Sequence, residues 1–454
     1  MEVFVMRKGF TLATVAIAIA AAVAAGGLSI TAFAGGTLYV SHSGIAGASD
    51  TNCNTAAYSS VQTAINAATN GSQVYLCGTV PYLESVVIQN KQVNLTGDPG
   101  AALKAPANAA APTTFFSSQN LQTPNSIVTV IGNVNVQING LIIEGPFENT
   151  SCAGDDFGVL QIKGGQLQMN NDKVLNIEAA DQEGLGGCQY GVGVQIGRYY
   201  WPVVTGTGND GFSDGYNIVN FTGNAQIQNT AVSGYQKNGI TADGQVSQIQ
   251  VQATTVDGGG LNAMIGRNGI QIGRGATGQV HNDSVNNNEY TGPGSFASAT
   301  AVLVFGGCQQ TSGGGPLSVG VQVHDNTLKN NDSGVVFSNF DPTCATAPSQ
   351  QTNGQTHDNT VSKGDGETNH SPYTDENGNN YTGYQVGVAD TGNNDQVHDN
   401  HMTGTVIDGI DTAYGPQTTP GGNFLAPVDI QTYPPINTQV HDNTLDGART
   451  NPPY

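Results

Sequence analysis

Three β-type segments of the sequence each end at a charged residue of a kind that takes part in catalysis. Arg198, Asp243 and Arg274 directly follow glycine-containing segments in which apolar residues alternate. An arginine donates paired hydrogen bonds to hydroxyl or carboxylate oxygens, and an aspartate with a suitable pKa serves as a general acid or base. If the segments lie side by side, these residues predict a catalytic site of a polysaccharide lyase or glycoside hydrolase. The alternative is a structural ion pair.

Aromatic residues follow the first of these charged positions and predict a substrate-binding surface. Tyr199 and Tyr200 precede Trp201, which is the single tryptophan of the chain, and Arg267 lies shortly before the last charged position. A flat ring stacks on the apolar face of a sugar, while an arginine binds its hydroxyl or carboxylate oxygens. We therefore expect these four residues to bind a glycan. The alternative is an aromatic loop folded over the protein.

Histidine recurs at one position of a repeated hexapeptide, whose clearest copies read Val-His-Asp-Asn-Thr-Leu or a close variant. The histidines are His281, His324, His357, His398 and His441. Imidazoles on neighbouring strands, about 4.8 Å apart, have to bend together to share a metal ion with M–N bonds of about 2.0–2.1 Å. A metal-binding accessory protein is therefore an alternative function, with the metal unknown. We favour a structural ladder, because duplication of a repeat places identical side chains in line.

The hexapeptides belong to an internal repeat that must position all of these residues. Looser copies precede the histidine copies at 88–93, 136–141, 227–232 and 251–256. A fixed motif with variable spacers, at periods of about 20–50 residues, is typical of a solenoid whose loops leave from one side. A second run of alternating apolar residues between the copies buries one face of another strand.

The order of elements within one repeat follows from the hexapeptide. Its asparagine has easy access to the left-handed backbone conformation, so we expect it at a sharp turn between two strands. Each rung of the solenoid is then a strand, an Asn turn, a short strand, a variable loop and a further strand.

These features resemble the right-handed parallel β-helix family of pectin-lyase-like proteins over nearly the whole chain after residue 34. The resemblance includes an N-terminal stretch, 58–68, with helical spacing of its apolar residues, and Gly71 suits the C-cap of that helix. It implies an all-β fold, namely a right-handed parallel β-helix solenoid with a short N-terminal capping helix. It implies little about function, since this fold carries lyases, hydrolases, surface adhesins and accessory proteins.

The standard catalytic motifs of this family are incomplete. The polygalacturonase-like set contains N-T-D, D-D, G-H-G and R-I-K; Asp155-Asp156 is the sole adjacent Asp pair here, and G-H-G and R-I-K do not occur. Pectate-lyase-like members combine an Arg base with carboxylates that hold Ca²⁺, and no arrangement of that kind matches residue by residue. Whether the protein is an enzyme therefore stays open, and Ca²⁺ is the cofactor that such a site would take.

The cysteines indicate an oxidising compartment. An even number of cysteines outside the cytosol is typical of disulfides, and we favour pairing in sequential order although other connectivities are open. The six residues are Cys53, Cys77, Cys152, Cys188, Cys308 and Cys344.

The first 34 residues have the pattern of a signal peptide. Arg7 and Lys8 precede an uncharged apolar stretch, and Ala32-Phe33-Ala34 forms an A-x-A cleavage site. An uncleaved membrane anchor is the alternative, because the apolar stretch is long enough to span a bilayer. We expect a secreted or cell-surface protein with one β-helix domain over 35–454, of which 446–454 form a tail.

The composition excludes some partners and favours others. The chain of 454 residues carries a formal charge of −21 with only 10% charged residues, so it lacks the basic face that nucleic-acid binding needs. We expect no membrane contact beyond the signal segment, and a monomer. The interpretation is an exported β-helix protein that binds or acts on extracellular carbohydrate; the alternative is a structural or adhesive surface protein.

Overall fold

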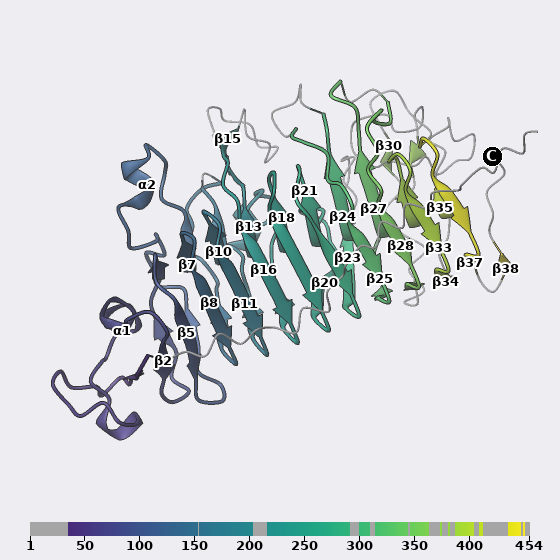
Figure 1. Cartoon of the computed structure of the whole chain (residues 1–454). Coiled ribbons are helices and arrows are strands. Elements are labelled where there is room, and N and C mark those ends of the chain that lie inside the picture. Colours follow the sequence, from purple (N-terminus) through teal and green to yellow (C-terminus); the bar gives the residue numbers. More distant parts are fainter. Residues whose placement is uncertain are drawn as a thin grey trace, which may run out of the picture. The chain divides into compact units, whose positions relative to one another are not determined.

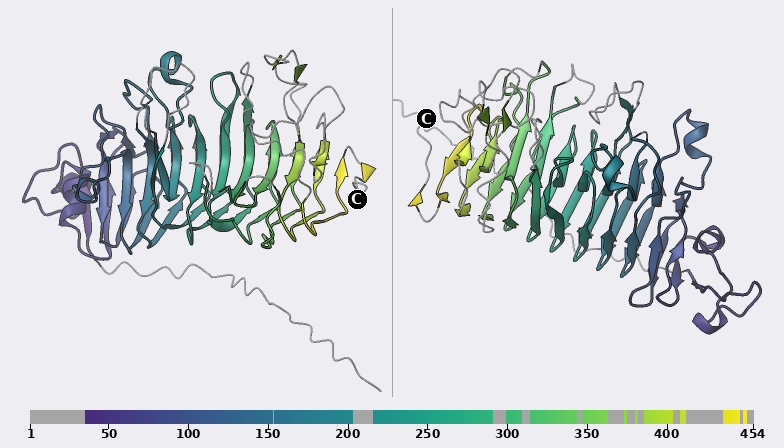
Figure 2. Two further views of the ribbon diagram at one scale, coloured as in Figure 1. Left: turned by 90° about the horizontal axis from the view of Figure 1, so that it is seen from above. Right: turned by 180° about the vertical axis from the view of Figure 1, so that it is seen from behind.

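Three long sheets of parallel strands form the protein (Figure 1). The computed structural model describes residues 35–152, 154–202, 216–290, 299–308, 314–343, 346–362, 373–374, 380–381, 386–403, 408–411, 435–445 and 448–449. Each strand pairs with the equivalent strand of the next rung, so the chain is a right-handed parallel β-helix. Successive rungs lie side by side along the solenoid in both views of Figure 2.

The strands are assigned to the sheets as follows. Sheet A contains β1 (Thr37–Val40), β2 (Ser72–Leu76), β5 (Val93–Gly97), β8 (Asn135–Asn139), β11 (Gln166–Asn170), β16 (Asn224–Gln228), β19 (Gln248–Gln252), β22 (Thr277–His281), β25 (Gln322–His324), β28 (Gln355–His357), β33 (Gln396–His398) and β36 (Gln439–His441). Sheet B contains β3 (Tyr82–Leu83), β6 (Ala102–Lys104), β9 (Ile142–Glu144), β12 (Lys173–Leu175), β17 (Ala231–Ser233), β20 (Thr255–Asn262), β23 (Ser284–Tyr290), β26 (Thr327–Lys329), β29 (Thr360–Ser362), β34 (His401–Thr403), β37 (Thr444–Leu445) and the antiparallel β38 (Ala448–Arg449). Sheet C contains β4 (Val86–Gln89), β7 (Asn125–Ile131), β10 (Asp156–Ile162), β13 (Val192–Gly197), β18 (Asn238–Asp243), β21 (Asn268–Gly273), β24 (Thr300–Gly306), β27 (Ser333–Asn339), β32 (Val386–Asp390) and β35 (Asp408–Asp411). Two hairpins pair β14 (Tyr199–Pro202) with β15 (Tyr216–Val219), and β30 (Tyr373–Thr374) with β31 (Asn380–Tyr381).

The core fills the inside of the solenoid with aliphatic side chains. In β8, for example, Val136 and Ile138 are fully buried while Gln137 between them faces outward, as expected for a strand with one face in the core. Sheet C has a second apolar layer on its outer face, where Phe115, Phe116 and other loop residues cover the strands. The strands β10, β13, β18 and β21 are buried on both faces along their whole length.

The turn between sheets A and B corrects one expectation. The left-handed residue of the hexapeptide is the aspartate, with φ of +57° at Asp325 and +55° at Asp358, and not the asparagine that follows. The asparagine is buried inside the turn, where Asn326 Nδ2 donates to Asn359 Oδ1 at 2.9 Å. An amide both donates and accepts, so it links the turns of successive rungs, whereas the exposed aspartate only has to tolerate the turn.

A second correction concerns segment 88–93, which is not a copy of the hexapeptide. Its first residues belong to β4 of sheet C and its last residue begins β5 of sheet A, so it spans a different corner of the rung. Through the paired strands Leu95 and Ile138 are in line with Val323, so the equivalent of the hexapeptide in this rung begins at Leu95, and the copy in the next rung begins at Ile138 rather than at Val136. Gly97 and Asp98 then stand where the later copies have Asp and Asn.

The expected N-terminal helix is present as α1 (Val61–Ala67). Ser60 caps its first turn, and Val61, Ala64 and Ile65 pack into the core; its role as a cap of the solenoid stays a prediction. Gly71 is not the C-cap, because Ala68 already leaves the helix with an extended backbone. The structure also describes further helices of about one turn in the loops, namely α2 (Phe115–Ser118), α3 (Gln182–Leu185) and the 3-10 helix η1 (Cys53–Thr55).

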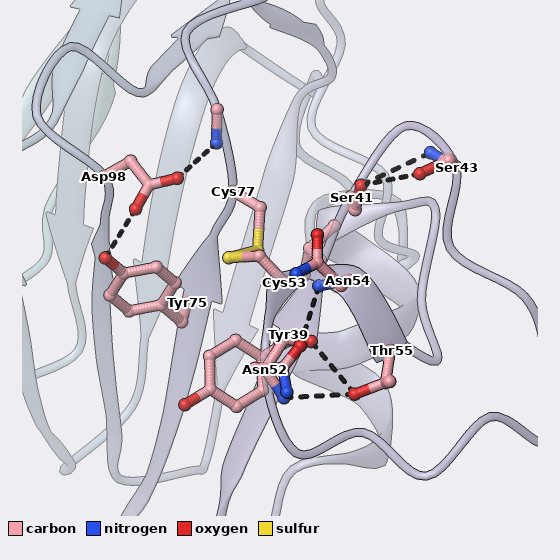
Figure 3. The surroundings of a disulfide bond; sticks show 12 residues. Tyr39, Ser41, Ser43, Asn52, Cys53, Asn54, Thr55, Tyr75, Cys77 and Asp98 are labelled. Atoms are coloured by element: carbon pink, nitrogen blue, oxygen red, sulfur yellow. Dashed lines mark hydrogen bonds between the residues drawn. A yellow bond between two sulfur atoms is a disulfide. The ribbon is translucent and has the colours of Figure 1, made fainter.

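The described cysteines are all disulfide-bonded, as the sequence predicts. Cys53 pairs with Cys77 and Cys152 with Cys188. Figure 3 shows the first bond beside Asp98, which accepts a hydrogen bond of 2.7 Å from the Tyr75 hydroxyl. Cys308 is also disulfide-bonded, and its expected partner Cys344 lies outside the described residues, as does the predicted signal peptide.

None of the helices in the described part of the chain has the length and apolar character needed to cross a membrane.

Candidate functional site

The three charged residues predicted to be catalytic lie on three neighbouring strands of sheet C. Gly197 of β13 pairs with Asp243 of β18, which in turn pairs with Gly273 of β21. Arg198 and Arg274 follow directly on the outer two strands. The alignment of the strand ends in the sequence therefore predicts their proximity correctly.

Asp243 is the centre of this group. Arg274 Nη1 donates to Asp243 Oδ2 at 2.5 Å, and the guanidinium of Arg274 lies 4.1 Å from the centre of the Phe305 ring. Arg198 donates from Nη2 to the Gly314 carbonyl at 3.0 Å. Burial raises the pKa of Asp243, and the charges of Arg274 and Arg198 act against that rise.

The group is almost inaccessible to solvent. Asp243 is 1% exposed, Arg198 4% and Arg274 9%. A general acid or base must come within hydrogen-bond reach of its substrate. Asp243 is buried with its Oδ2 bound by Arg274, and its Oδ1 is buried without a hydrogen-bond partner among the described residues. The arrangement is that of a buried ion pair, and a reaction at these residues stays a prediction.

Two of the predicted substrate-binding residues, Tyr199 and Arg267, have described side chains, and both lie away from the Asp243–Arg274 contact. Tyr199 is 1% exposed and its ring meets Phe157 edge-on, with centroids 5.5 Å apart; burial raises its pKa. Tyr200 and Trp201 belong to β14, and their side chains lie outside the described residues. Arg267 precedes β21 whereas Arg274 follows it, so the length of the strand separates them. Arg267 Nη1 donates to the Gly258 carbonyl, and burial lowers the pKa of Arg267.

A cleft of about 570 Å³ opens beside the buried pair. It is lined by the turns that follow Asp243 and Arg274 and by segments of two loops, which follow β24 and β27; the lining residues are Gln245, Val246, Gln248, Gly275, Thr277, Gly307, Gly315, Pro316, Leu317, Val319, Phe340, Pro342, Pro348, Ser349 and Gln350. Gly315 lies directly against both arginines, where a β-carbon would be 2.7 Å from Arg198 Nη1 and 2.7 Å from Arg274 Cβ. The buried pair thus supports one wall of the cleft.

The backbone is strained at one apolar residue of the cleft lining. Val246 has a φ of +60° and is 64% exposed. A β-branched residue in the left-handed region is a true outlier, and such strain costs on the order of 1–3 kcal/mol and clusters at functional sites. The sequence gives no signal for this residue beyond Gly244, two residues earlier, because the turn depends on contacts between rungs.

The histidines form the predicted ladder on the outer side of sheet A. Consecutive ring centroids, from His281 through His324, His357 and His398 to His441, are 5.2, 4.9, 4.9 and 5.0 Å apart, with ring planes within 7° of parallel. The Nδ1 atoms of the last four rings lie 2.8–3.0 Å from the carboxylate of the following aspartate.

This geometry does not suit chelation of a metal ion. Parallel rings about 5 Å apart hold their nitrogens further apart than two M–N bonds of about 2.0–2.1 Å allow without rotation. Within the described residues, no three His, Cys, Asp or Glu side chains converge to hold a metal. Any site for Ca²⁺ stays a prediction.

Two carboxyl groups that sequence reasoning missed face each other in the turn after β32. Asp390 is fully buried and Asp395 is 1% exposed. Asp390 Oδ1 accepts from the Gly392 N–H at 2.7 Å, and Asp395 Oδ1 accepts from the Thr352 hydroxyl at 2.6 Å. Burial and the neighbouring carboxyl group raise the pKa of Asp390, and burial raises that of Asp395.

Asp390→Asn is expected to make the protein less sensitive to rising pH. The pKa of Asp390 is higher in the folded than in the unfolded chain, so its contribution to stability is present below the unfolded pKa and is lost as pH rises through the folded pKa. The asparagine side chain cannot ionise, and its carbonyl oxygen can still accept the hydrogen bond from the Gly392 N–H. Between about pH 5 and pH 8, the variant should lose less thermal stability than the parent. Glu148→Gln, at an exposed acid, is the control, and a parent-like profile for Asp390→Asn would contradict the prediction.

Comparison with known proteins supports the fold. No protein-family model and no curated protein sequence matches the chain. The selenomethionine derivative of the GH136 lacto-N-biosidase from Eubacterium ramulus is similar in structure, with a TM-score of 0.50 and 11% identity over 90% of this chain and 67% of that chain. At this identity the likeness concerns the fold alone, and it agrees with the pectin-lyase-like β-helix that the sequence resembles.

Two further solved structures show lower similarity. The alginate lyase from Paenibacillus sp. str. FPU-7 has a TM-score of 0.42 and 11% identity over 77% of this chain and 94% of that chain. PfbA, a surface adhesin of Streptococcus pneumoniae, has a TM-score of 0.38 and 14% identity over 85% of this chain and 86% of that chain.

Proposed function

We propose that this protein is exported and binds a neutral saccharide in the cleft beside the Asp243–Arg274 pair. The observation that carries the proposal is the cleft itself, which combines an exposed, strained valine with amide and hydroxyl groups. Ligand sites of this size have apolar walls with a few polar groups that fix the orientation of the ligand. Disulfide-bonded cysteines support export, because disulfides persist outside the reducing cytosol.

The chemistry of the lining favours an uncharged ligand. Gln245, Gln248 and Gln350 supply amides that donate and accept hydrogen bonds, which is the pattern that sugar hydroxyls complement. Arg198 and Arg274 lie behind Gly315 of this wall, and their described contacts include Gly314, Asp243 and Phe305. An acidic sugar would therefore meet no lining cation.

Binding is favoured over cleavage because Asp243, the predicted acid or base, lies behind the wall of the cleft. The carboxylate of Asp243 is held by Arg274 behind the wall of the cleft, so the pair positions the wall and does not touch the ligand. A polysaccharide lyase or glycoside hydrolase would need Asp243 to reach the scissile bond. The release of new reducing ends or of unsaturated products from a polysaccharide would overturn this preference.

Val246→Gly is expected to weaken saccharide binding while making the fold more stable. Glycine removes the strain at a positive φ, which is worth on the order of 1 kcal/mol, and it also removes the apolar surface on which a sugar ring rests. Calorimetric titration with neutral oligosaccharides and thermal unfolding measure the two effects. Val80→Gly, at a valine that is 62% exposed and outside the cleft lining, is the control. If Val246→Gly gains stability and binds every oligosaccharide as the parent does, the strain has no role in binding.

A further inference from the structure

The outer face of sheet A carries an unbroken row of glutamines, here called the amide row. One glutamine occupies the same register position on consecutive strands from β8 to β36, which lie side by side in Figure 1. The row consists of Gln137, Gln168, Gln226, Gln250, Gln279, Gln322, Gln355, Gln396 and Gln439. The sequence repeats Gln-Val-His in the later rungs, so the row was visible there in part.

Next to the amide row runs a second polar row, two residues further along each strand. It begins with the amides of Asn139, Asn170, Gln228 and Gln252 and continues as the five stacked histidines. A chain with 34 acidic residues thus places none of them at these register positions of the face. The two rows themselves carry no formal charge when the histidines are neutral, and the exposed carboxylates of the aspartates that follow the last four histidines flank the second row at the turn.

The amide row extends beyond the histidine repeat. The histidine repeat covers only the strands from β22 onward, whereas the row begins at Gln137, in a strand that reads Asn-Val-Gln-Ile-Asn. Rungs with different local sequences therefore place the same amide at the same point. Direct amide–amide bonds join some members, such as Gln279 to Gln322 at 2.9 Å.

The histidines add acceptors in a fixed orientation. An Nδ1–H that donates to the neighbouring aspartate, as in His324 with Asp325 at 2.8 Å and His357 with Asp358 at 2.8 Å, leaves Nε2 as the lone-pair acceptor. These acceptors repeat once per rung, at the 4.9–5.2 Å spacing of the ring centroids. A ligand with hydroxyl groups at the same repeat can bind each rung in the same way.

We propose that this face of sheet A binds an extended, neutral, β-1,4-linked polysaccharide that lies along the solenoid with about one sugar per rung. In such a chain each sugar advances by the length of one pyranose ring and its linkage, which is close to the spacing of about 4.8 Å between strands. Successive sugars are turned over, so hydroxyl groups face every rung, and the same hydroxyl groups recur at every second rung. The uncharged rows match a neutral polymer in charge, and many weak contacts in line give avidity to a long chain that a short one lacks. This surface is separate from the proposed function of the cleft, which takes a short saccharide.

The test removes the acceptors of the imidazole ladder and measures retention on insoluble cellulose. The variant His324→Ala/His357→Ala/His398→Ala should lose at least about tenfold in affinity, since each lost hydrogen bond contributes a few-fold, with little change in thermal unfolding. His401→Ala is the matched control, because His401 lies on sheet B and is exposed; its retention should equal that of the parent. Gln322→Thr/Gln355→Thr, which keeps strand-forming residues, should lose affinity as well.

Several outcomes would overturn this inference. They are a parent protein that cellulose does not retain, a triple variant that binds as the parent does, and a loss for His401→Ala equal to that of the triple variant. The inference would also be overturned if an α-linked glucan gel retained the parent protein as strongly as cellulose does. Val246→Gly should keep full retention on cellulose, so failure of the cleft proposal and failure of this one give different results.

Discussion

Asp243→Ala is expected to lower the free energy of unfolding by about 3–5 kcal/mol, because it breaks a buried ion pair by removing one of its two charges. The lost contact is the 2.5 Å bond to a carboxylate that is 1% exposed. Arg198, which also lies close to that carboxylate, loses its counter-charge at the same time. Denaturant unfolding followed by circular dichroism measures the change.

The control is an ion pair of the same kind on the surface. Lys104 Nζ lies 3.6 Å from Glu144 Oε1, and the two side chains are 35% and 28% exposed. Exposed ion pairs contribute no more than about 1 kcal/mol to the free energy of unfolding. Glu144→Ala should therefore unfold almost as the parent does. A loss for Asp243→Ala no larger than that for Glu144→Ala would show that the carboxylate is hydrated and free to serve in chemistry.

Asn359→Ala is expected to cost on the order of 3 kcal/mol, because one side chain satisfies donors and acceptors of several turns. Its Nδ2 donates to Asn400 Oδ1 at 2.9 Å and to the Val323 carbonyl at 2.9 Å, and its Oδ1 accepts from the main chain and side chain of Asn326. Thr360→Ala, at the next and exposed residue, should change stability by less than about 0.5 kcal/mol. Equal effects of the two substitutions would contradict a stabilising ladder.

Asn359→Asp provides a pH-dependent version of the same test. Asp283 naturally occupies the equivalent place, where burial raises its pKa to about 7. An aspartate at position 359 should likewise have a raised pKa in the folded protein. Its contribution to the stability of the fold is then present at low pH and is lost as pH rises through that pKa. Unfolding at about pH 5 should resemble that of the parent, and unfolding at about pH 8 that of Asn359→Ala. A variant that is equally stable at both pH values would contradict this account.

The sequence predicts the order of elements well, because one rung repeats local signals. The hexapeptide marks the corner between sheets A and B, and the alternating apolar runs mark sheet C. The N-terminal rungs are harder to predict, since Gly97 and Asp98 stand where later rungs have recognisable Asp and Asn residues, and the local pattern at 88–93 imitates the hexapeptide at a different corner. The choice of Asp325 rather than Asn326 for the left-handed position depends on the amide ladder between rungs, which no single rung reveals.

The sequence predicts which residues of the candidate site lie on neighbouring strands, but it does not predict how exposed their side chains are. Equivalent strand ends place Arg198, Asp243 and Arg274 together, as expected from pattern alone. Their burial depends on the loop after β24, whose Gly315 fits against both arginines, and such a contact between distant segments leaves no periodic signal. The strain at Val246 and the facing carboxyl groups of Asp390 and Asp395 arise from the same kind of long-range contact.

The asparagine ladder has a direction, and this direction bears on the order in which the chain is completed. In each bond along it, the N–H groups of one turn donate to the oxygen of the turn that follows in sequence, from Asn326 to Asn359, Asn400 and Asn443. A ribosome releases the donor before it releases the acceptor. Each newly synthesised coil therefore closes the bond left open by its predecessor, and the growing end always presents the next donor. The solenoid can therefore fold one coil at a time from a folded N-terminal end, before the C-terminal residues have been synthesised.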